Sequence, residues 1–395
     1  MQRVLSIAFA LLLLVGCATA PYTGRSQLLL VSEGQEVGVG QEAYRHILRD
    51  SVLSNNAEAE RIVRKVGERI ARAANKPEYQ WEFRVIDDPD TANAFAVPGG
   101  KVAVYTGIFP VARDEAGLAV ILGHEIAHAL LRHPGERMSQ EMLVQLGGVG
   151  LAGALGSNPQ LAGQVLQAYG LGANVGVILP FGRSQESEAD HVGLILMAKA
   201  GYDPRVALEM WERMERNERR GGPPEYLSTH PSYETRTEQL KAWMPEALSY
   251  YQPSNSRVEM LPALRDLDSP VARAERELLK RIQGINQRAS DPRGQRAVVE
   301  ALGYALHLNP SFVYRERQEA GLGYGQYAAL RGVSLLGGAP ISRVAADYQR
   351  GVRWFNLADG NGTRISALIS WMGDVMRSTG SLQGGQMPTS RYRVR

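Results

Sequence analysis

The chain of 395 residues carries 44 basic and 41 acidic side chains, for a formal net charge of +3, and 44% of its residues are apolar. This length favours two domains over one, and the balanced charge gives no reason to expect a nucleic-acid partner. A single cysteine, Cys17, excludes both an intrachain disulfide framework and a cysteine-rich metal site.

Residues 1–16 have the pattern of a lipoprotein signal peptide. Arg3 precedes an apolar run over residues 4–15, which is too short to span a bilayer comfortably. The motif LVGC at residues 14–17 resembles the bacterial lipobox, in which the peptide is cut before the cysteine and the cysteine is then acylated. The sequence therefore predicts that Cys17 carries a lipid. The alternative is an ordinary signal peptide with an incidental cysteine.

Ala18 follows the predicted lipidation site. In Gram-negative lipoproteins an aspartate at this place usually signals retention in the inner membrane. By this analogy we expect a protein anchored in the cell envelope through its lipid, on the periplasmic face of the outer membrane.

The chain before residue 113 predicts helix followed by a small sheet. Residues 42–73 have helical spacing, because Ile62, Val66 and Ile70 return to one face. Three short apolar stretches are predicted strands, of which the last two flank a Pro-Gly-Gly turn: 79–86, 95–97 and 101–106.

A strongly apolar helix is predicted over residues 115–133, and Pro134 helps to end it. The glycine- and alanine-rich segment 142–179 predicts closely packed core helices or a mobile lid. Further helices are predicted over 184–199, 205–215 and 234–243.

The motif HEIAH at residues 124–128 is the strongest functional signal. On a helix His124 and His128 lie roughly 40° apart on one face, so both imidazoles can meet one cation. Zinc accepts such nitrogens at about 2.0–2.1 Å, and Glu125 lies beside them as a candidate general base for the attacking water. The alternative, two histidines placed by chance, fits poorly with an apolar helix, because buried ionisable groups are costly unless something binds them.

A catalytic zinc usually takes three protein ligands, so a third must come from another segment. His133 lies about 180° around the same predicted helix from the first histidine and is excluded. Glu186 is the best candidate, because in a helix over 184–199 it shares a face with Asp190, while Glu188 points roughly the opposite way. Asp190 would then orient a liganding imidazole. The alternative is a solvated acidic helix start.

Four motifs follow one another along the chain: NAFAVPGG at 93–100, HEIAH at 124–128, RSQESEAD at 183–190, and STHP at 228–231 with Arg236. Together they resemble the motifs of peptidase family M48, the family of HtpX, the CAAX prenyl proteases and the BepA-like periplasmic proteases. The resemblance runs from about residue 63 to 248 and does not cover residues 257–395. Gly182 stands where the family usually has serine, which loosens one motif without changing its Arg-to-Glu spacing.

The resemblance implies an α+β, predominantly helical fold of the gluzincin type, with a small sheet beside the HEXXH helix. It implies a zinc metalloendopeptidase with one Zn²⁺ per chain, bound by His124, His128 and Glu186. Glu125 would be the catalytic base.

Two further features follow from the resemblance, each with an alternative. Residues 101–106 would form the edge strand on which an extended substrate pairs, or else a plain structural hairpin. His230 would stabilise the oxyanion, or occupy the open position on zinc and hold the enzyme off. It could also be an ordinary loop histidine.

The predicted organisation has five parts. Helices in the C-terminal part are predicted over 270–285, 295–308, 341–357 and 364–375, and its role is unassigned. The parts are a signal peptide (1–16), an N-terminal lead-in and helix (17–60), a zinc metallopeptidase domain (61–250), a helical C-terminal domain (251–378) and a disordered tail (379–395).

We therefore expect a peptidase whose substrates are misfolded or unassembled envelope proteins. This substrate class rests on the resemblance and on the predicted anchor. A rival function is an envelope chaperone or assembly factor with a latent peptidase site. Turnover of unfolded casein that a chelator abolishes would separate the two.

Overall fold

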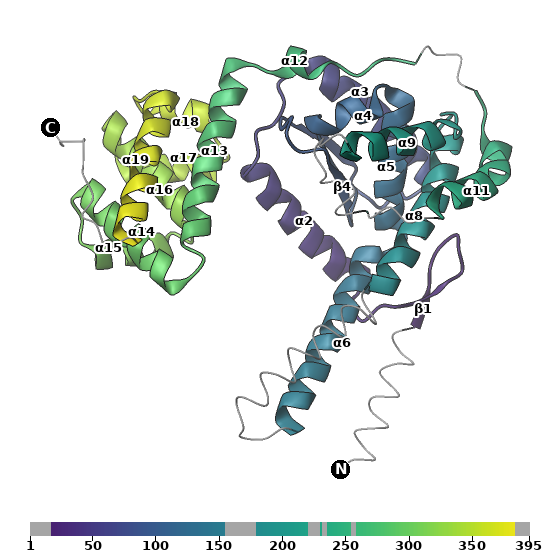
Figure 1. Ribbon diagram of the computed structural model, residues 1–395, viewed down its shortest axis with the longest axis horizontal. Helices are drawn as coiled ribbons and strands as arrows, with labels where there is room; N and C mark the ends of the chain where they lie inside the picture. The colour runs from purple at the N-terminus through teal and green to yellow at the C-terminus, as the bar shows by residue number, and fades with distance from the viewer. Residues whose placement is uncertain (1–16, 155–178, 220–229, 231–234, 254–257, 384–395) are drawn as a thin grey trace. The chain divides into compact units, whose positions relative to one another are not determined.

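The computed structural model of the protein describes residues 17–154, 179–219, 230, 235–253 and 258–383 (Figure 1). Two compact units divide the chain: Met1–Leu48 with Leu53–Leu267, and Arg49–Val52 with Asp268–Arg395. This division falls after Leu267, C-terminal to the domain boundary predicted at residue 250. The predicted signal peptide and residues 155–178 of the glycine-rich stretch lie outside the described residues.

Helices make up most of the first unit. Its longer described helices are α2 (Glu33–Arg49), α3 (Ala57–Ala74), α5 (Glu115–Leu130), α6 (His133–Ala154), α8 (Leu179–Lys199), α9 (Val206–Arg219) and α11 (Arg236–Tyr250). Short turns of helix are η1 (Thr106–Ile108), α4 (Phe109–Ala112) and α12 (Leu264–Leu267).

The helix predicted over residues 42–73 is wrong in its extent, because the chain forms two helices there, α2 and α3. The side chain of Asn56 accepts a hydrogen bond from the Ala59 N–H and begins α3. Just before it, Leu53 forms an isolated β-bridge with Ile86, so the connecting residues are extended. The periodicity of each helix is visible in the sequence, and Asn56 is the residue that marks the start of the second helix.

A three-stranded sheet has the order β3-β5-β4, with β3 at Glu82–Ile86, β4 at Ala94–Val97 and β5 at Lys101–Tyr105. The predicted hairpin forms, since β4 pairs antiparallel with β5. The prediction that residues 101–106 are an edge strand is wrong, because β3 pairs in parallel with the other side of β5. Of the two strands in the predicted hairpin, β4 is therefore the one at an edge of the sheet. A separate two-stranded sheet joins β1 (Cys17–Thr19) to β2 (Ser26–Leu28).

Helix α5 lies at the centre of the first unit and packs against α3, α8 and β4. Its apolar side chains Leu118, Ile121 and Leu122 are completely buried, and each contributes about 1.5–3 kcal/mol through the hydrophobic effect. Gly123 and Gly193 allow α5 and α8 to approach closely. A Cβ atom on Gly193 would lie only 2.8 Å from the backbone nitrogen of His124. This contact brings the acidic motif of α8 to the histidines of α5.

The second unit is helical in the part that the structure describes. Its helices are α13 (Pro270–Arg288), α14 (Pro292–Leu306), α15 (Pro310–Glu319), α16 (Tyr324–Gly337), α17 (Ile341–Gln349), α18 (Trp354–Gly360) and α19 (Ile365–Gln383). Helices α15 and α16 were not predicted, although Asn309 before Pro310 is a helix-start signal, and the side chain of Asn309 caps α15.

The predicted disordered tail begins too early. Helix α19 continues to Gln383, and within it Thr379 is completely buried and donates a hydrogen bond to the carbonyl of Val375. Polar composition suggested disorder, but packing buries this turn. Residues 384–395 lie outside the described residues.

The predicted α+β, predominantly helical fold is confirmed, with a small sheet beside α5 and helices in the C-terminal part. Among the described residues, no helix combines the length and the apolar character that are needed to cross a membrane.

Candidate metal centre

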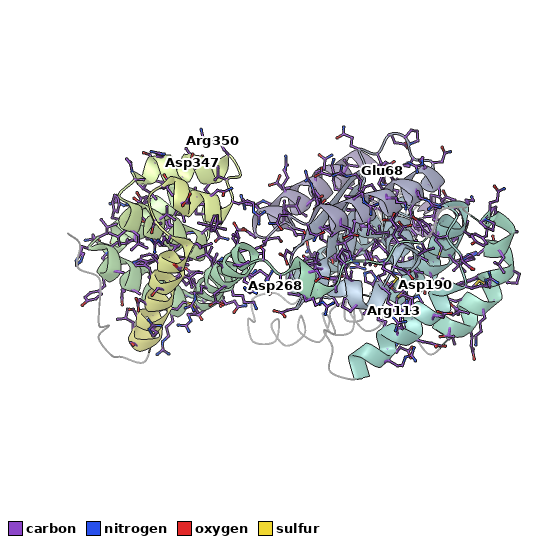
Figure 2. The ribbon with its side chains drawn as sticks, turned by 90° about the horizontal axis from the view of Figure 1, so that it is seen from above. Glu68, Arg113, Asp190, Asp268, Asp347 and Arg350 are labelled. Carbon is purple, nitrogen blue, oxygen red and sulfur yellow. The ribbon has the colours of Figure 1, made fainter. Side chains whose placement is uncertain are left out.

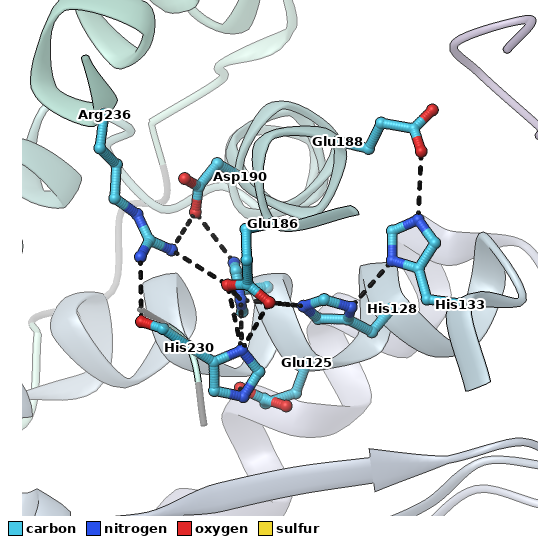
Figure 3. Close-up of polar contacts among 9 residues, drawn as sticks. Glu125, His128, His133, Glu186, Glu188, Asp190, His230 and Arg236 are labelled. Atoms are coloured by element: carbon cyan, nitrogen blue, oxygen red, sulfur yellow. Dashed lines mark hydrogen bonds and ion pairs between the residues drawn. The ribbon is translucent and has the colours of Figure 1, made fainter. Parts of the chain in front are cut away.

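Helix α5 presents His124, Glu125 and His128 in the interior of the first unit, where all three are buried. Asp114 begins the helix by accepting a hydrogen bond from the Gly117 N–H at 2.9 Å. The two histidines lie one turn apart, and their Nε2 atoms are 3.1 Å from each other. The predicted convergence of both imidazoles is therefore present in the structure, and Figure 3 shows His128 of this pair beside Glu186.

Helix α8 brings the carboxylate of Glu186 to the same point. Its oxygens lie 3.3 Å from Nε2 of His124 and 3.3 Å from Nε2 of His128. As the helical spacing predicts, Asp190 lies on the same side of α8 and reaches His124, whereas Glu188 turns elsewhere.

His230 reaches this group from a segment that is far away in the sequence. Its Nδ1 atom lies 3.1 Å from Nε2 of His124 and 3.1 Å from a carboxylate oxygen of Glu186. Its Nε2 atom lies 3.4 Å from Oε1 of Glu125. One donor atom from each of His124, His128, Glu186 and His230 falls within a cluster in which all separations are at most 4.8 Å.

The spacing and chemistry of this donor cluster fit a small divalent cation. A tetrahedral zinc ion with bonds of about 2.0–2.1 Å places its donor atoms about 3.3 Å apart. The imidazole and carboxylate donors of the cluster are separated by 3.1 and 3.3 Å along its close edges. Three imidazole nitrogens and one carboxylate oxygen are also ligand types that zinc prefers.

Asp190 contacts the His124 imidazole on the side away from the donor cluster, and Arg236 contacts Asp190. Asp190 Oδ1 lies 2.9 Å from Nδ1 of His124, which leaves Nε2 for the cluster. The Arg236 guanidinium donates to the same Oδ1 at 2.6 Å and lies over the ring of Trp211, 3.4 Å from its centroid. Asp190 is thus a buried carboxylate with a cation on one side and an imidazole on the other, and Figure 3 shows its contact with Arg236.

The electrostatics of the site favour a positive charge at His124, which lies between the carboxylates of Glu186 and Asp190. Burial alone lowers the pKa of His124, but Asp190 and Glu186 outweigh burial and raise this pKa to about 9. Burial lowers the pKa of His128 well below its ordinary value, so this imidazole is neutral, the form that binds a metal. Burial acts to raise the pKa of Glu186, yet the neighbouring histidines hold it below its usual range.

The helical argument that separated His133 from the site is wrong in its premise. Helix α5 ends at Leu130, and Arg132 has a positive φ of 58°, so His133 begins a new helix, α6. His133 is not among the four donors, but its Nδ1 lies 2.8 Å from Nδ1 of His128. The sequence feature that points to this contact is a histidine five residues after the HEIAH motif. A single continuous helix through residue 133 would have turned it away from His128.

Comparisons with known proteins identify the family of this chain. The sequence profile of peptidase family M48 matches residues 57–244. The mitochondrial metalloendopeptidase OMA1 of Schizosaccharomyces pombe is 36% identical over 249 residues, which is 62% of this chain and 72% of that protein. The chain belongs to peptidase family M48.

Two further relatives are similar over part of the chain. The OMA1 protein of Saccharomyces cerevisiae is 32% identical over 254 residues, which is 60% of this chain and 71% of that protein. The beta-barrel assembly-enhancing protease of Escherichia coli is 30% identical over 223 residues, which is 55% of this chain and 45% of that protein. The predicted enzyme class is confirmed: the chain is a metal-dependent endopeptidase that acts on proteins.

Proposed function

We propose that this M48 peptidase uses one zinc ion, held by His124, His128 and Glu186. The observation that carries the proposal is the buried donor cluster at the contact of α5 and α8, with close edges of 3.1 and 3.3 Å. When bound, zinc polarises the scissile carbonyl and activates water for attack. Asp190 orients His124 for this role.

Glu125 is the general base of the proposed reaction. It precedes His128 by three residues on α5, is buried, and lies next to the donor cluster with one oxygen 3.4 Å from His230. It takes the proton of the attacking water and passes it to the leaving amine.

His230 acts as a gate in this proposal. Its Nδ1 atom lies among the donors, at 3.1 Å from both His124 and Glu186, and this place supports the role of a fourth ligand over that of an oxyanion donor. A fourth protein ligand closes the position that water needs, so the enzyme is held off until His230 moves away.

The edge strand β4 is the proposed docking site for an extended substrate. It packs against α5, and its outer side pairs with no other strand in the described part of the chain. Main-chain hydrogen bonds along such an edge give affinity for many sequences. This mode suits an enzyme whose substrates share an unfolded state and no common sequence.

Misfolded or unassembled envelope proteins are the proposed substrates, with the enzyme anchored through a lipid on Cys17 at the periplasmic face of the outer membrane. The LVGC motif at residues 14–17 supports the anchor. The name of the Escherichia coli relative, a beta-barrel assembly-enhancing protease, supports an envelope substrate. The gate supports latency, which a peptidase needs among proteins that it must not destroy.

A pair of substitutions tests the proposed roles in the purified full chain. Glu125→Gln removes the base and keeps the ligands, so zinc content should stay at one per chain while casein turnover falls by about 100-fold or more. Glu186→Ala removes a ligand, so it should lose zinc as well as activity. A Glu186→Ala variant that keeps both zinc and turnover would show that the third ligand lies elsewhere.

A further inference from the structure

The two histidines of α5 are held in different ways on the side away from the donor cluster. Nδ1 of His124 contacts the carboxylate of Asp190 at 2.9 Å, the common arrangement for a liganding imidazole. Nδ1 of His128 instead contacts a second imidazole, Nδ1 of His133, at 2.8 Å. The mechanism described above gives His133 no task.

With both rings neutral and Nε2 of His128 left for the metal, only one arrangement of protons satisfies both ring contacts of His133. With Nε2 of His128 in the donor cluster, the proton of this neutral ring lies on Nδ1, which donates to Nδ1 of His133. His133 then carries its own proton on Nε2 and donates it to Oε2 of Glu188 at 3.2 Å. The exposed fractions of His128, His133 and Glu188 are 7%, 1% and 8%, so water cannot readily replace these partners.

The N-terminal hairpin holds the far end of this chain of contacts. Arg25, just before β2, donates through Nε to Oε2 of Glu188 at 2.7 Å, and the Thr23 hydroxyl also contacts Glu188. The two terminal nitrogens of Arg25 donate to the oxygens of Glu136 at 2.8 and 2.6 Å. One guanidinium therefore compensates two buried carboxylates.

We infer that His133 is a positioning residue for the metal ligand His128, and that Arg25 fixes His133 through Glu188. The inference rests on the proposed function, because His128 needs this orientation only as a ligand. The hairpin of β1 and β2 then supports the metal centre, because it carries Arg25. His133 fixes the tautomer and the ring plane of His128, as the Asp190 carboxylate does for His124.

Zinc affinity of the full chain, measured by competition with a chelating dye, tests the inference without relying on activity. His133→Leu removes the acceptor at similar volume and should weaken zinc binding by about 10–100-fold. His133→Asn places an amide oxygen near the position of Nδ1 and should recover most of the affinity. Arg25→Met should weaken zinc binding in the same direction as His133→Leu, by a smaller factor.

Arg353→Met is the matched control. Arg353 pairs with the buried Glu275 in the second unit, so removal of Arg353 also leaves a buried carboxylate without its cation. Glu275 is far in the sequence from every donor of the cluster. The zinc affinity of Arg353→Met should therefore equal that of the wild type. A loss as large as in Arg25→Met would mean that general instability explains the effect, which would overturn the role of Arg25.

Further outcomes separate the inference from the proposed function. If His128→Ala loses zinc but a folded His133→Leu binds it like the wild type, the positioning role is overturned while the ligand set stands. If His128→Ala itself keeps its zinc affinity, the ligand set is wrong. Nitrogen-15 NMR of the zinc-loaded wild type needs no variant: protonated Nδ1 on His128 and protonated Nε2 on His133 are expected, and the reverse tautomers would overturn the inference.

Discussion

At the scale of single residues, the cluster is built so that each α5 imidazole offers one nitrogen inward. Asp190 occupies the second nitrogen of His124, and His133 occupies that of His128. Buried ionisable groups are stable here because each has a partner, and Arg236 over Trp211 supplies the cation that Asp190 needs. Of the four donors, only His230 comes from a segment outside α5 and α8, and its movement would leave the three proposed ligands in place.

His230→Ala should therefore increase the cleavage of casein and of the enzyme itself, while the zinc content stays unchanged. If the closed state of the gate is favoured by about 1.4 kcal/mol, removal of His230 should increase the rate of cleavage about tenfold. Casein turnover and zinc content of wild type and variant are the measurements.

His191→Ala is the control for this prediction, because His191 lies on α8, the helix of Glu186, but contacts Glu246 at 2.7 Å and is not a member of the donor cluster. Its turnover should match that of the wild type. A fall in the rate of His230→Ala by about 100–1000-fold at unchanged zinc content would contradict the gate and favour an oxyanion role.

At the scale of elements, the close contact of α5 with α8 forms the donor cluster, and the edge of β4 that pairs with no described strand is the proposed docking site for substrate. The Tyr105 N–H donates to the Asn93 carbonyl, and in an antiparallel ladder alternate residues face the partner strand. With Phe95 paired to Ala103 in the same register, Ala96 directs its N–H and carbonyl away from β5. This N–H is available to an extended substrate.

Ala96→Pro removes that N–H without breaking the ladder to β5, because proline is tolerated on edge strands. Since one backbone hydrogen bond contributes about 0.5–1.5 kcal/mol net, kcat/KM for casein should fall by roughly twofold to tenfold. Ala96→Val keeps the N–H and should stay close to the wild type. An equal loss in both variants would point to crowding and would contradict main-chain pairing at Ala96.

At the scale of the whole molecule, the donors and the hairpin that supports them all belong to the first unit, whereas the second unit has its own helical core. Asp190 is buried in the first unit, whereas Asp347 of the second unit pairs with the exposed Arg350; Figure 2 labels all three residues. The proposed lipid at Cys17 would join the membrane to the start of the hairpin that carries Arg25.

Cys17→Ser should abolish lipid labelling and move the protein from the membrane fraction to the soluble fraction. Metabolic labelling with a fatty acid and fractionation of cells are the measurements. Zinc content should be unchanged, because Cys17 is not a member of the donor cluster. Ala18→Ser, which keeps the cysteine, should still be labelled. Labelling that persists in Cys17→Ser would show that the lipid is attached elsewhere or that the motif is incidental.

The sequence by itself determined the features that depend on near neighbours along the chain. Helical periodicity is a property of the local backbone, so the spacing alone places His124 and His128 on one face of a helix, and Glu186 and Asp190 on one face of another. The Pro-Gly-Gly turn predicted the hairpin of β4 and β5 for the same reason.

Only the tertiary structure decided which distant segments meet. Because β3 pairs in parallel with β5, the edge strand of the hairpin is β4 and not β5 as predicted. Because α5 ends at Leu130, His133 can contact His128. Arg25 and Glu188 are separated by more than 160 residues, and their contact depends on how two elements pack. No local pattern encodes such a contact, because the attraction between the two groups becomes large only when folding brings them together away from water.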